Sequence, residues 1–342
     1  MRAKKRAGGI LAACLTAGLA FSFLSFAEPA AAEKIRVTQP VDTLNLMARY
    51  VAQSKGYFAR EGLEVEVVVT RGGGPDVQAV IGGHAAFSLT GGTYLVNAHV
   101  QGKPVIAVYN LVGRLTINLL IRKDVAKRRG ISRDMPLARR IRAAKGLTFG
   151  ATRPGAFTYL IARYLLRKGG LDPGRDVRLI GIGGPPALLA ALERGRIQVM
   201  VMSSPASAAA ILRGFGTYLV NSSGGEVPEM NELLNAPVLV APSTLKRRPD
   251  LIRKFLRALD DGQKFAIEHP PEEVVPLVEK SFGRIPPKIL RASIAEIRPA
   301  LVPGGAITRR AVEALMDLME AGGSLPRRIP WDRMATNRFL PR

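Results

Sequence analysis

Short apolar runs alternate with helical stretches along this chain from residue 33 onward. The segment 35–38 is an apolar run typical of a strand, and Leu44, Met47, Ala48 and Val51 then share one helical face. Further strands are predicted at 63–69, 86–90, 105–110, 117–121, 147–151, 177–182, 197–202, 217–220 and 238–241. The residues between several of these runs have helical periodicity. This alternation predicts an α/β protein.

The elements form two comparable arrays, followed by a tail that is mainly helical. The second array begins near residue 116, and the tail begins after 241. In open α/β arrays, loops at the carboxyl ends of parallel strands face a crevice, and helix amino termini direct partial positive charge into it. We therefore expect a ligand site between two lobes.

The first 32 residues have the pattern of a secretory signal peptide. Four basic residues lie within positions 2–6, an uncharged stretch covers 8–27, and Ala30, Ala31 and Ala32 precede Glu33. This order predicts cleavage after Ala32 and export to the periplasm. The alternative is an uncleaved anchor, because 10–27 is 18 residues long, near the lower limit for a membrane span. The small residues and the polar continuation favour cleavage.

Cysteine and histidine usage argues against catalysis. The single cysteine, Cys14, is followed by most of the apolar stretch, whereas a lipoprotein signal places the cysteine after it, so we do not expect a lipid anchor. The cleaved chain would then have no cysteine for a disulfide or thiol chemistry. The three histidines (His84, His99 and His269) lack metal-ligand spacing, and no phosphate-loop or nucleophile-elbow motif is present. We predict no enzyme activity, no metal and no cofactor.

The chain is strongly basic. It has 50 Lys and Arg against 27 Asp and Glu, a net charge of +23, and the segment after residue 32 keeps 46 and 26, a net charge of +20. Such a charge can attract nucleic acid or anionic lipid. Export and the wide spread of arginine along the chain argue against nucleic acid. We interpret the charge as a mostly solvated surface on a monomer, one that can also help to hold an anionic ligand.

Several motifs, in the same order, resemble the nitrate/sulfonate/taurine and thiamine-precursor family of binding proteins. The opening motif is Lys55-Gly56-Tyr57-Phe58 followed by Glu61-Gly62-Leu63-Glu64-Val65, which resembles the family's "KGYF–x–x–EGL–x–V". The later matches are 72–74 with 79–83, 120–124, 145–150 with 153–155, 190–198, and Pro249 with 255–259. The resemblance covers about residues 35–265. Each motif is short, and their shared order carries the likeness.

The resemblance implies a type II periplasmic-binding-protein fold, with two open α/β lobes joined by a two-strand hinge. We place the first lobe at 33–115 and 240–342, and the second lobe at 116–239. The implied function is capture of a small ligand, which can be anionic, in a cleft that closes like a hinge. The implied partner is the membrane permease of an ABC importer.

Within that fold, the loops after the strands are the candidate ligand contacts. Arg153, Gly155 and Ala156 lie between a strand and a helix start, where free N–H groups and an arginine suit a carboxylate, sulfonate or phosphate; an ordinary turn with a solvent-facing arginine is the alternative. Ser204 has helix capping as its alternative role. The other candidates are Gln39, Arg71, Gly72, Thr90, Gly91, Asn110 and Ser203.

Two other functions remain open from the sequence. The same fold hosts a pyrimidine synthase for thiamine and enzymes of menaquinone synthesis, but the synthase needs a cysteine-rich motif that this chain lacks. The other alternative is a periplasmic sensor that presents its ligand to a membrane protein of a different kind. Fold alone does not name the ligand.

Overall fold

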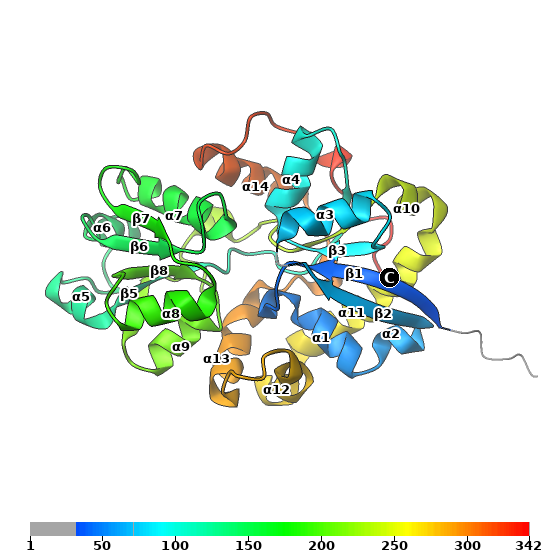
Figure 1. Ribbon diagram of the computed structural model, residues 1–342, viewed down its shortest axis with the longest axis horizontal. Coiled ribbons are helices and arrows are strands. Elements are labelled where there is room, and N and C mark those ends of the chain that lie inside the picture. The colour runs from blue at the N-terminus through cyan, green and yellow to red at the C-terminus, as the bar shows by residue number, and fades with distance from the viewer. Residues whose placement is uncertain (1–31, 71, 342) are drawn as a thin grey trace, which may run out of the picture. The chain divides into compact units, whose positions relative to one another are not determined.

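Two five-stranded sheets, each covered by helices, make up the structure (Figure 1). It is a computed structural model that describes residues 32–70 and 72–341. The expected signal peptide, apart from Ala32, lies outside these residues, as does Arg71. Within the described residues, no helix is both long and apolar enough to cross a membrane.

The first sheet has the strand order β2-β1-β3-β10-β4. Its strands are β1 (Glu33–Gln39), β2 (Leu63–Val69), β3 (Phe87–Leu89), β4 (Ile106–Asn110) and β10 (Pro237–Val240). Strand β1 pairs in parallel with β2 and β3, whereas β10 is antiparallel to both β3 and β4. The parallel strands bring Gln39, Val69 and Leu89 to the same edge of the sheet.

The second sheet has the order β7-β6-β8-β5-β9. Its strands are β5 (Asn118–Arg122), β6 (Thr148–Ala151), β7 (Arg178–Gly181), β8 (Val199–Met202) and β9 (Gly216–Val220). Strand β6 is parallel to β7 and β8, and β5 is antiparallel to β8 and β9. The chain enters this sheet after β4 and leaves it before β10. We call the part built on the first sheet lobe I and the part built on the second sheet lobe II.

Helices pack on both faces of the sheets. In lobe I and its tail they are α1 (Met47–Ser54), α2 (Tyr57–Arg60), α3 (Gly73–Ile81), α4 (Gly92–Val100), α10 (Pro242–Arg247), α11 (Pro249–Glu268), α12 (Pro271–Val278), α13 (Pro287–Ile297) and α14 (Arg309–Ala321). In lobe II they are α5 (Lys123–Arg128), α6 (Leu137–Arg142), α7 (Phe157–Lys168), α8 (Pro185–Glu193) and α9 (Ala206–Leu212). Short 3₁₀ turns are η1 (Leu44–Leu46), η2 (Pro228–Met230), η3 (Glu279–Ser281), η4 (Arg298–Ala300), η5 (Pro303–Gly305) and η6 (Trp331–Arg333).

A row of aromatic rings fixes the long helix α11 against the first sheet. The Phe87 ring on β3 stacks on Phe255 of α11 with ring centroids 4.0 Å apart, and Phe58 of α2 stacks on the same ring at 5.2 Å. All three side chains are at most 2% exposed. Burial of such rings contributes about 1.5–3 kcal/mol each to stability, and residues distant in the chain thereby build one core.

The observed strands agree with those predicted from the apolar runs, and the two-lobed α/β fold class is confirmed. The pattern missed α4, because both sides of this helix are buried: Leu95 and Val96 are fully buried, and Gly92 and Thr93 are also buried. A helix buried all round loses the one-sided periodicity that marks a surface helix. The basic stretch at 122–145 also contains two helices, α5 and α6.

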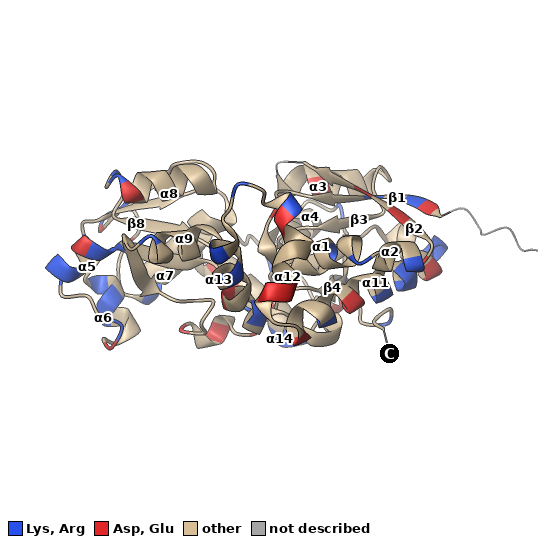
Figure 2. Cartoon of the chain, turned by 90° about the horizontal axis from the view of Figure 1, so that it is seen from below, with Lys and Arg blue, Asp and Glu red and all other residues tan. Residues whose placement is uncertain are grey.

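The basic residues are spread over the surface. Figure 2 shows Lys and Arg on α5 and α6 at one end of the view, and others around α2 and α11 at the other end. Many are paired, for example Arg257 with Glu61 and Arg128 with Asp124. This distribution differs from a single basic stripe of the kind that tracks a nucleic-acid backbone.

Candidate ligand-binding site

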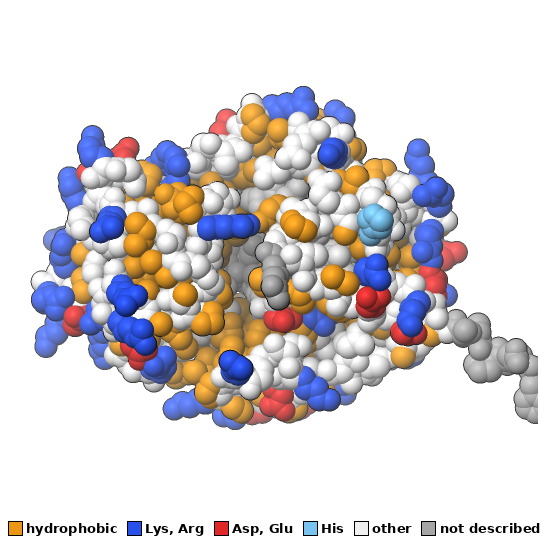
Figure 3. Space-filling view, in the orientation of Figure 1, with side chains coloured by type: hydrophobic (Ala, Val, Ile, Leu, Met, Phe, Trp, Pro, Cys, Tyr) orange, Lys and Arg blue, Asp and Glu red, His pale blue; other side chains and the backbone are white. Residues whose placement is uncertain are grey.

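The cleft begins where Arg153 of lobe II approaches Gly72 of lobe I. A methyl group at Gly72 would lie 4.0 Å from the Arg153 nitrogen Nη2. Figure 3 shows the surface hollowed in the middle of the view, between its two halves. Arg153 is exposed, and no carboxylate among the described residues forms an ion pair with it. An unpaired guanidinium at the border of a hollow is suited to bind an anion.

The amino terminus of α7 lies directly beside this arginine. Gly155 has a φ of 78°, which favours glycine, and the turn ends at Ala156 with no side-chain cap. The Ala156 amide donates to the Arg153 carbonyl at 3.2 Å. The next amides, of Phe157 and Thr158, donate to no backbone carbonyl among the described residues. The helix therefore presents these two amides, rather than that of Ala156, together with the positive end of its dipole.

A cavity of about 400 Å³ adjoins the same helix start. Its walls are formed by residues of α4, α7 and α14 and of the loops that flank them. They are Thr93, Tyr94, Asn97, Pro154, Gly155, Ala156, Phe157, Tyr159, Leu160, Arg163, Met319, Gly322, Gly323 and Ser324. This set includes the aromatic rings of Tyr94, Phe157 and Tyr159. It also includes Arg163, whose Nε is buried without a hydrogen-bond partner among the described residues. The size and lining suit an organic molecule rather than a bare inorganic ion.

Thr90 and Gly91 lie beside the same region. A methyl group at Gly73 would lie 2.7 Å from the Thr90 hydroxyl and clash with the Tyr94 ring, and one at Gly91 would lie 3.7 Å from that ring. The structure thus brings Gly72, Thr90, Gly91, Gly155 and Ala156 together around Tyr94 and Arg153. Tyr94 and Arg163 were missed from the sequence, because α4 was not predicted and Arg163 has no motif around it.

A buried carboxylate lies under the Gly72–Gly73 turn. Asp76, in the first turn of α3, is fully buried and accepts a 2.6 Å hydrogen bond from the Thr70 hydroxyl. Burial raises the pKa of Asp76 to about 6, although the nearby hydroxyls of Thr70 and Thr90 favour the charged form. The sequence pattern did not single out Asp76, because an acidic residue in a first helical turn is common.

Gln39 and Asn110 lie at strand ends as expected, but each is held by the protein itself. The Gln39 Nε2 donates to Asp42 Oδ1 at 2.8 Å, and the Asn110 Nδ2 donates to the Leu233 carbonyl at 3.1 Å. Asn110 lines a separate hollow of about 200 Å³ beside the segments that connect the lobes. The carbonyl oxygens of both side chains are buried without a hydrogen-bond partner among the described residues.

Ser203 and Ser204 are both buried, at 6% and 2% exposure. The Ser204 hydroxyl donates to Glu296 Oε2 at 2.7 Å and lies 2.8 Å from the Ser207 hydroxyl. Ser204 thus has a protein partner in this structure, and a carboxylate takes the place that we expected for a ligand. Arg71 is the one candidate that falls outside the described residues.

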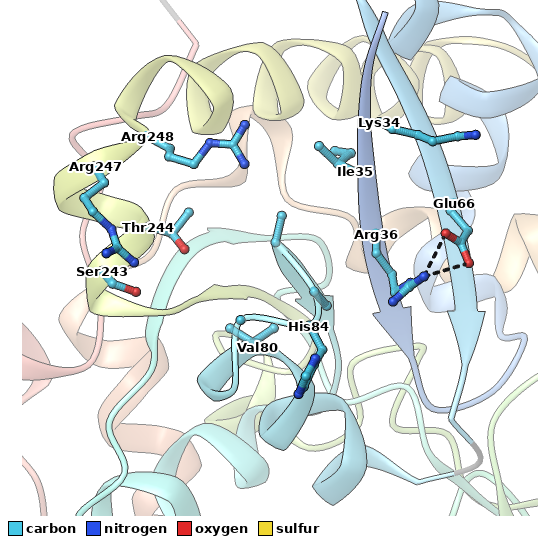
Figure 4. A pocket seen from close by; sticks show the side chains of 13 residues that line it. Lys34, Ile35, Arg36, Glu66, Val80, His84, Ser243, Thr244, Arg247 and Arg248 are labelled. Atoms are coloured by element: carbon cyan, nitrogen blue, oxygen red, sulfur yellow. Dashed lines mark hydrogen bonds and ion pairs between the residues drawn. The ribbon is translucent and has the colours of Figure 1, made fainter.

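A third hollow, of about 450 Å³, lies at the opposite ends of the lobe I strands (Figure 4). Its cations are largely matched by carboxylates: Arg36 lies 3.2 Å from Glu66, and Arg248 pairs with Glu33. In Figure 4 the Arg36 side chain points to Glu66 across neighbouring strands. None of the predicted site residues that the structure describes lines this hollow. The described candidate residues of lobe I lie instead at the other ends of its strands.

Comparison with known proteins places the chain in a family. The model of the NMT1/THI5 like family matches residues 43–273. The chain belongs to the NMT1/THI5-like family. This match confirms the resemblance to the nitrate, sulfonate and taurine binding proteins that the motifs indicated.

Relatives and solved structures agree with this assignment. The chain is 25% identical to "Putative binding protein YtlA" of Bacillus subtilis over 305 residues, covering 88% of this chain and 87% of that protein. It is 26% identical to the riboflavin-binding protein RibY of Chloroflexus aurantiacus over 326 residues, covering 85% and 81%. The periplasmic aliphatic sulphonate binding protein SsuA of Escherichia coli shares the fold, with a TM-score of 0.69 at 16% identity over 88% and 91% of the two chains.

These relatives are described as binding proteins, which supports solute binding as the general role of this NMT1/THI5-like protein. RibY is named for riboflavin and SsuA for aliphatic sulphonates, so the likeness to these proteins does not name the ligand of this chain. Among the described residues, no cluster of three or more His, Cys, Asp or Glu side chains is arranged to hold a metal ion.

Proposed function

We propose that this protein is the exported solute-binding component of an ABC importer, and that it captures a small organic anion between its lobes. The observation that carries the proposal is that the Phe157 and Thr158 amides and the Arg153 guanidinium, which have no protein acceptor or carboxylate partner among the described residues, lie at the start of α7 opposite Gly72 of lobe I. Two kinds of donor at one point suit a carboxylate, sulfonate or phosphate. The periplasm is its proposed location, and a membrane permease is its proposed partner.

The cavity of about 400 Å³ beside α7 extends this proposal to the rest of the ligand. Tyr94, Phe157 and Tyr159 offer aromatic surface within reach of the helix start. Planar rings stack on such side chains, so the proposed ligand joins an acidic group to an aromatic or apolar body. Riboflavin, for which RibY is named, matches the aromatic body, and the sulphonates for which SsuA is named match the acidic group.

A thermal-shift panel on the protein beginning at Glu33 tests the proposal. The panel contains alkyl and aryl sulfonates, nitrate, aliphatic and aromatic carboxylates, pyrimidines, flavins and, as cations, polyamines. A ligand present at about 100 times its dissociation constant stabilises the folded state by roughly 2.7 kcal/mol, which is readily measured. We expect a response from one class of organic anions. A response confined to neutral or cationic compounds would contradict the anion site.

A second measurement separates a binding protein from an enzyme. Each responding compound is incubated with the protein and recovered, and its mass is measured by mass spectrometry. Recovery of the unchanged compound is the expected result, because a carrier releases what it captured. Conversion of the compound would favour the enzyme alternative.

A further inference from the structure

A carboxylate of lobe I enters lobe II. Glu296 lies on α13, whose Leu290, Ile294 and Ile297 are fully buried in the core of lobe I. Glu296 extends from another face of this helix and reaches side chains of the second sheet and of α9. The helix is thus anchored in one lobe while its charged group is bound by the other.

Five side chains of lobe II direct donors at this carboxylate. Three contact Oε1 and two contact Oε2. The contacts with Oε1 are Asn118 Nδ2 at 2.7 Å, Ser223 Oγ at 3.1 Å and Ser207 Oγ at 3.2 Å, and those with Oε2 are Ser204 Oγ at 2.7 Å and Tyr218 OH at 3.1 Å. A carboxylate has about four lone-pair positions, so four of these groups donating at once meet its full accepting capacity. Each serine hydroxyl has one proton to donate, and these hydroxyls also have other partners: Ser204 and Ser207 lie 2.8 Å apart, and Ser223 Oγ lies 3.0 Å from Asn221 Oδ1.

The donors are held in place without Glu296. The Asn118 Oδ1 accepts the Ser223 backbone amide at 3.1 Å, which turns the Asn118 NH₂ group toward the carboxylate. Asn118, Ser204, Ser207 and Ser223 are each at most 2% exposed. The Asn118 NH₂ group and the Tyr218 hydroxyl have no other acceptor among the described residues. A buried donor that loses its acceptor is unfavourable, so an anion or an equivalent acceptor at this position stabilises lobe II.

We propose that lobe II contains a carboxylate-binding site, and that the Glu296 side chain of lobe I is its resident occupant. The site takes carboxylates, because neutral hydrogen-bonding side chains contact both oxygen atoms of one planar group. Its occupation by Glu296 fastens the two lobes together at the turn that carries Ser204. This inference goes beyond the capture of a transported ligand and does not depend on that ligand's identity.

Chemical rescue tests the site directly. Glu296→Ala removes the two carbons and two oxygens that acetate supplies. Sodium acetate is compared with sodium chloride at one ionic strength, about 0.1 M, so that screening is equal. We expect the Tm of the variant to fall by about 5 °C or more in chloride and to recover in part in acetate.

Two controls show whether the acetate effect is specific. The unmodified protein and Glu273→Ala, which alters an exposed residue of α12, should respond alike to both salts. Equal Tm values of the variant in acetate and chloride would overturn the proposal.

A reciprocal exchange covers the case in which Glu296→Ala does not fold. Glu296→Gln places an NH₂ group against donors, and Asn118→Asp places a second carboxylate against the first, so each change alone should lower the Tm. Together they restore one donor facing one carboxylate across the lobes. The double variant should be more stable than the sum of the single effects predicts. Additive losses would show that no specific contact joins these two positions.

Discussion

The Tyr109 hydroxyl donates a 2.8 Å hydrogen bond to the Asp260 carboxylate, between β4 and α11. Tyr109 is fully buried, and Asp260 is 2% exposed. The second oxygen of Asp260 lies 2.8 Å from the Lys264 ammonium group. Burial and the neighbouring carboxylate raise the pKa of Tyr109 far above its usual value, so the hydroxyl stays a donor. This contact ties the first sheet to the longest helix.

Tyr109→Phe should lower the free energy of unfolding by about 1–3 kcal/mol, because the Asp260 carboxylate keeps its burial and loses a donor. Urea unfolding followed by circular dichroism measures the change. Tyr57→Phe is the control, since Tyr57 is half-buried and its hydroxyl forms no hydrogen bond among the described residues. Equal losses in both variants would show that the Tyr109 hydroxyl adds nothing.

Gly262→Ala should destabilise the protein, opposite to the usual effect in a helix. Gly262 lies within α11, and a methyl group there would be 2.2 Å from the Ala48 carbonyl oxygen of α1. Alanine normally favours a helix by about 1 kcal/mol over glycine, but here the backbones of two helices would have to separate. We expect a net loss of about 1–3 kcal/mol in urea unfolding.

Gly283→Ala is the control for this change, because a methyl group at Gly283 would meet nothing closer than 4.0 Å. Its stability should stay within about 0.5 kcal/mol of the unmodified protein. A stabilised Gly262→Ala variant would mean that α1 and α11 do not pack as closely as the structure shows.

Because of Asp76, the free energy of unfolding should fall as the pH rises from about 4 to above 6. The folded pKa of about 6 lies above the ordinary value of 3.8, so between these values the folded protein binds more protons than the unfolded chain. Its contribution is therefore most favourable near pH 4 and is lost as the pH rises through about 6. The two pKa values differ by about 2 units, which corresponds to roughly 3 kcal/mol.

Asp76→Asn replaces the ionisable group with a neutral one of similar shape. Relative to the unmodified protein, the variant should gain stability between pH 4 and pH 7.5, measured by urea unfolding at both values. Asp332→Asn, at an exposed position, serves as the control and should show no such gain. A constant difference between Asp76→Asn and the unmodified protein at both pH values would refute the raised pKa.

Arg153→Gln should weaken binding of the anion that responds in the thermal-shift panel. A hydrogen bond to a charged group contributes about 1.5–3 kcal/mol, so the Kd should rise by roughly 10- to 150-fold. Isothermal titration calorimetry measures this change, and urea unfolding should show unchanged stability, because Arg153 is exposed. Arg196→Gln, also exposed in lobe II, controls for the loss of one positive charge. Equal weakening in both variants would point to general attraction by the basic surface instead of a specific contact.

Much of the local structure could be predicted because strands and helices each have a characteristic period of apolar and polar residues. The alternation of Leu63, Val65 and Val67 with acidic residues matches β2, an edge strand with a half-exposed face. The helical stripe from Phe157 to Leu165 matches α7. The motif order also led to the correct family. The lobe boundaries and the ligand contacts stay predictions.

By itself, the amino-acid sequence determined the two-lobed α/β class and the loops in which a ligand site is expected, because hydrophobic period and turn residues act over a few positions. Only the tertiary structure decided that β10 lies between β3 and β4, that Tyr94 and Arg163 line a cavity with the start of α7, and that Ser204 faces Glu296. Ser204 and Glu296 are separated by 92 positions. Contacts over such distances depend on how the whole core packs, and no local pattern encodes them.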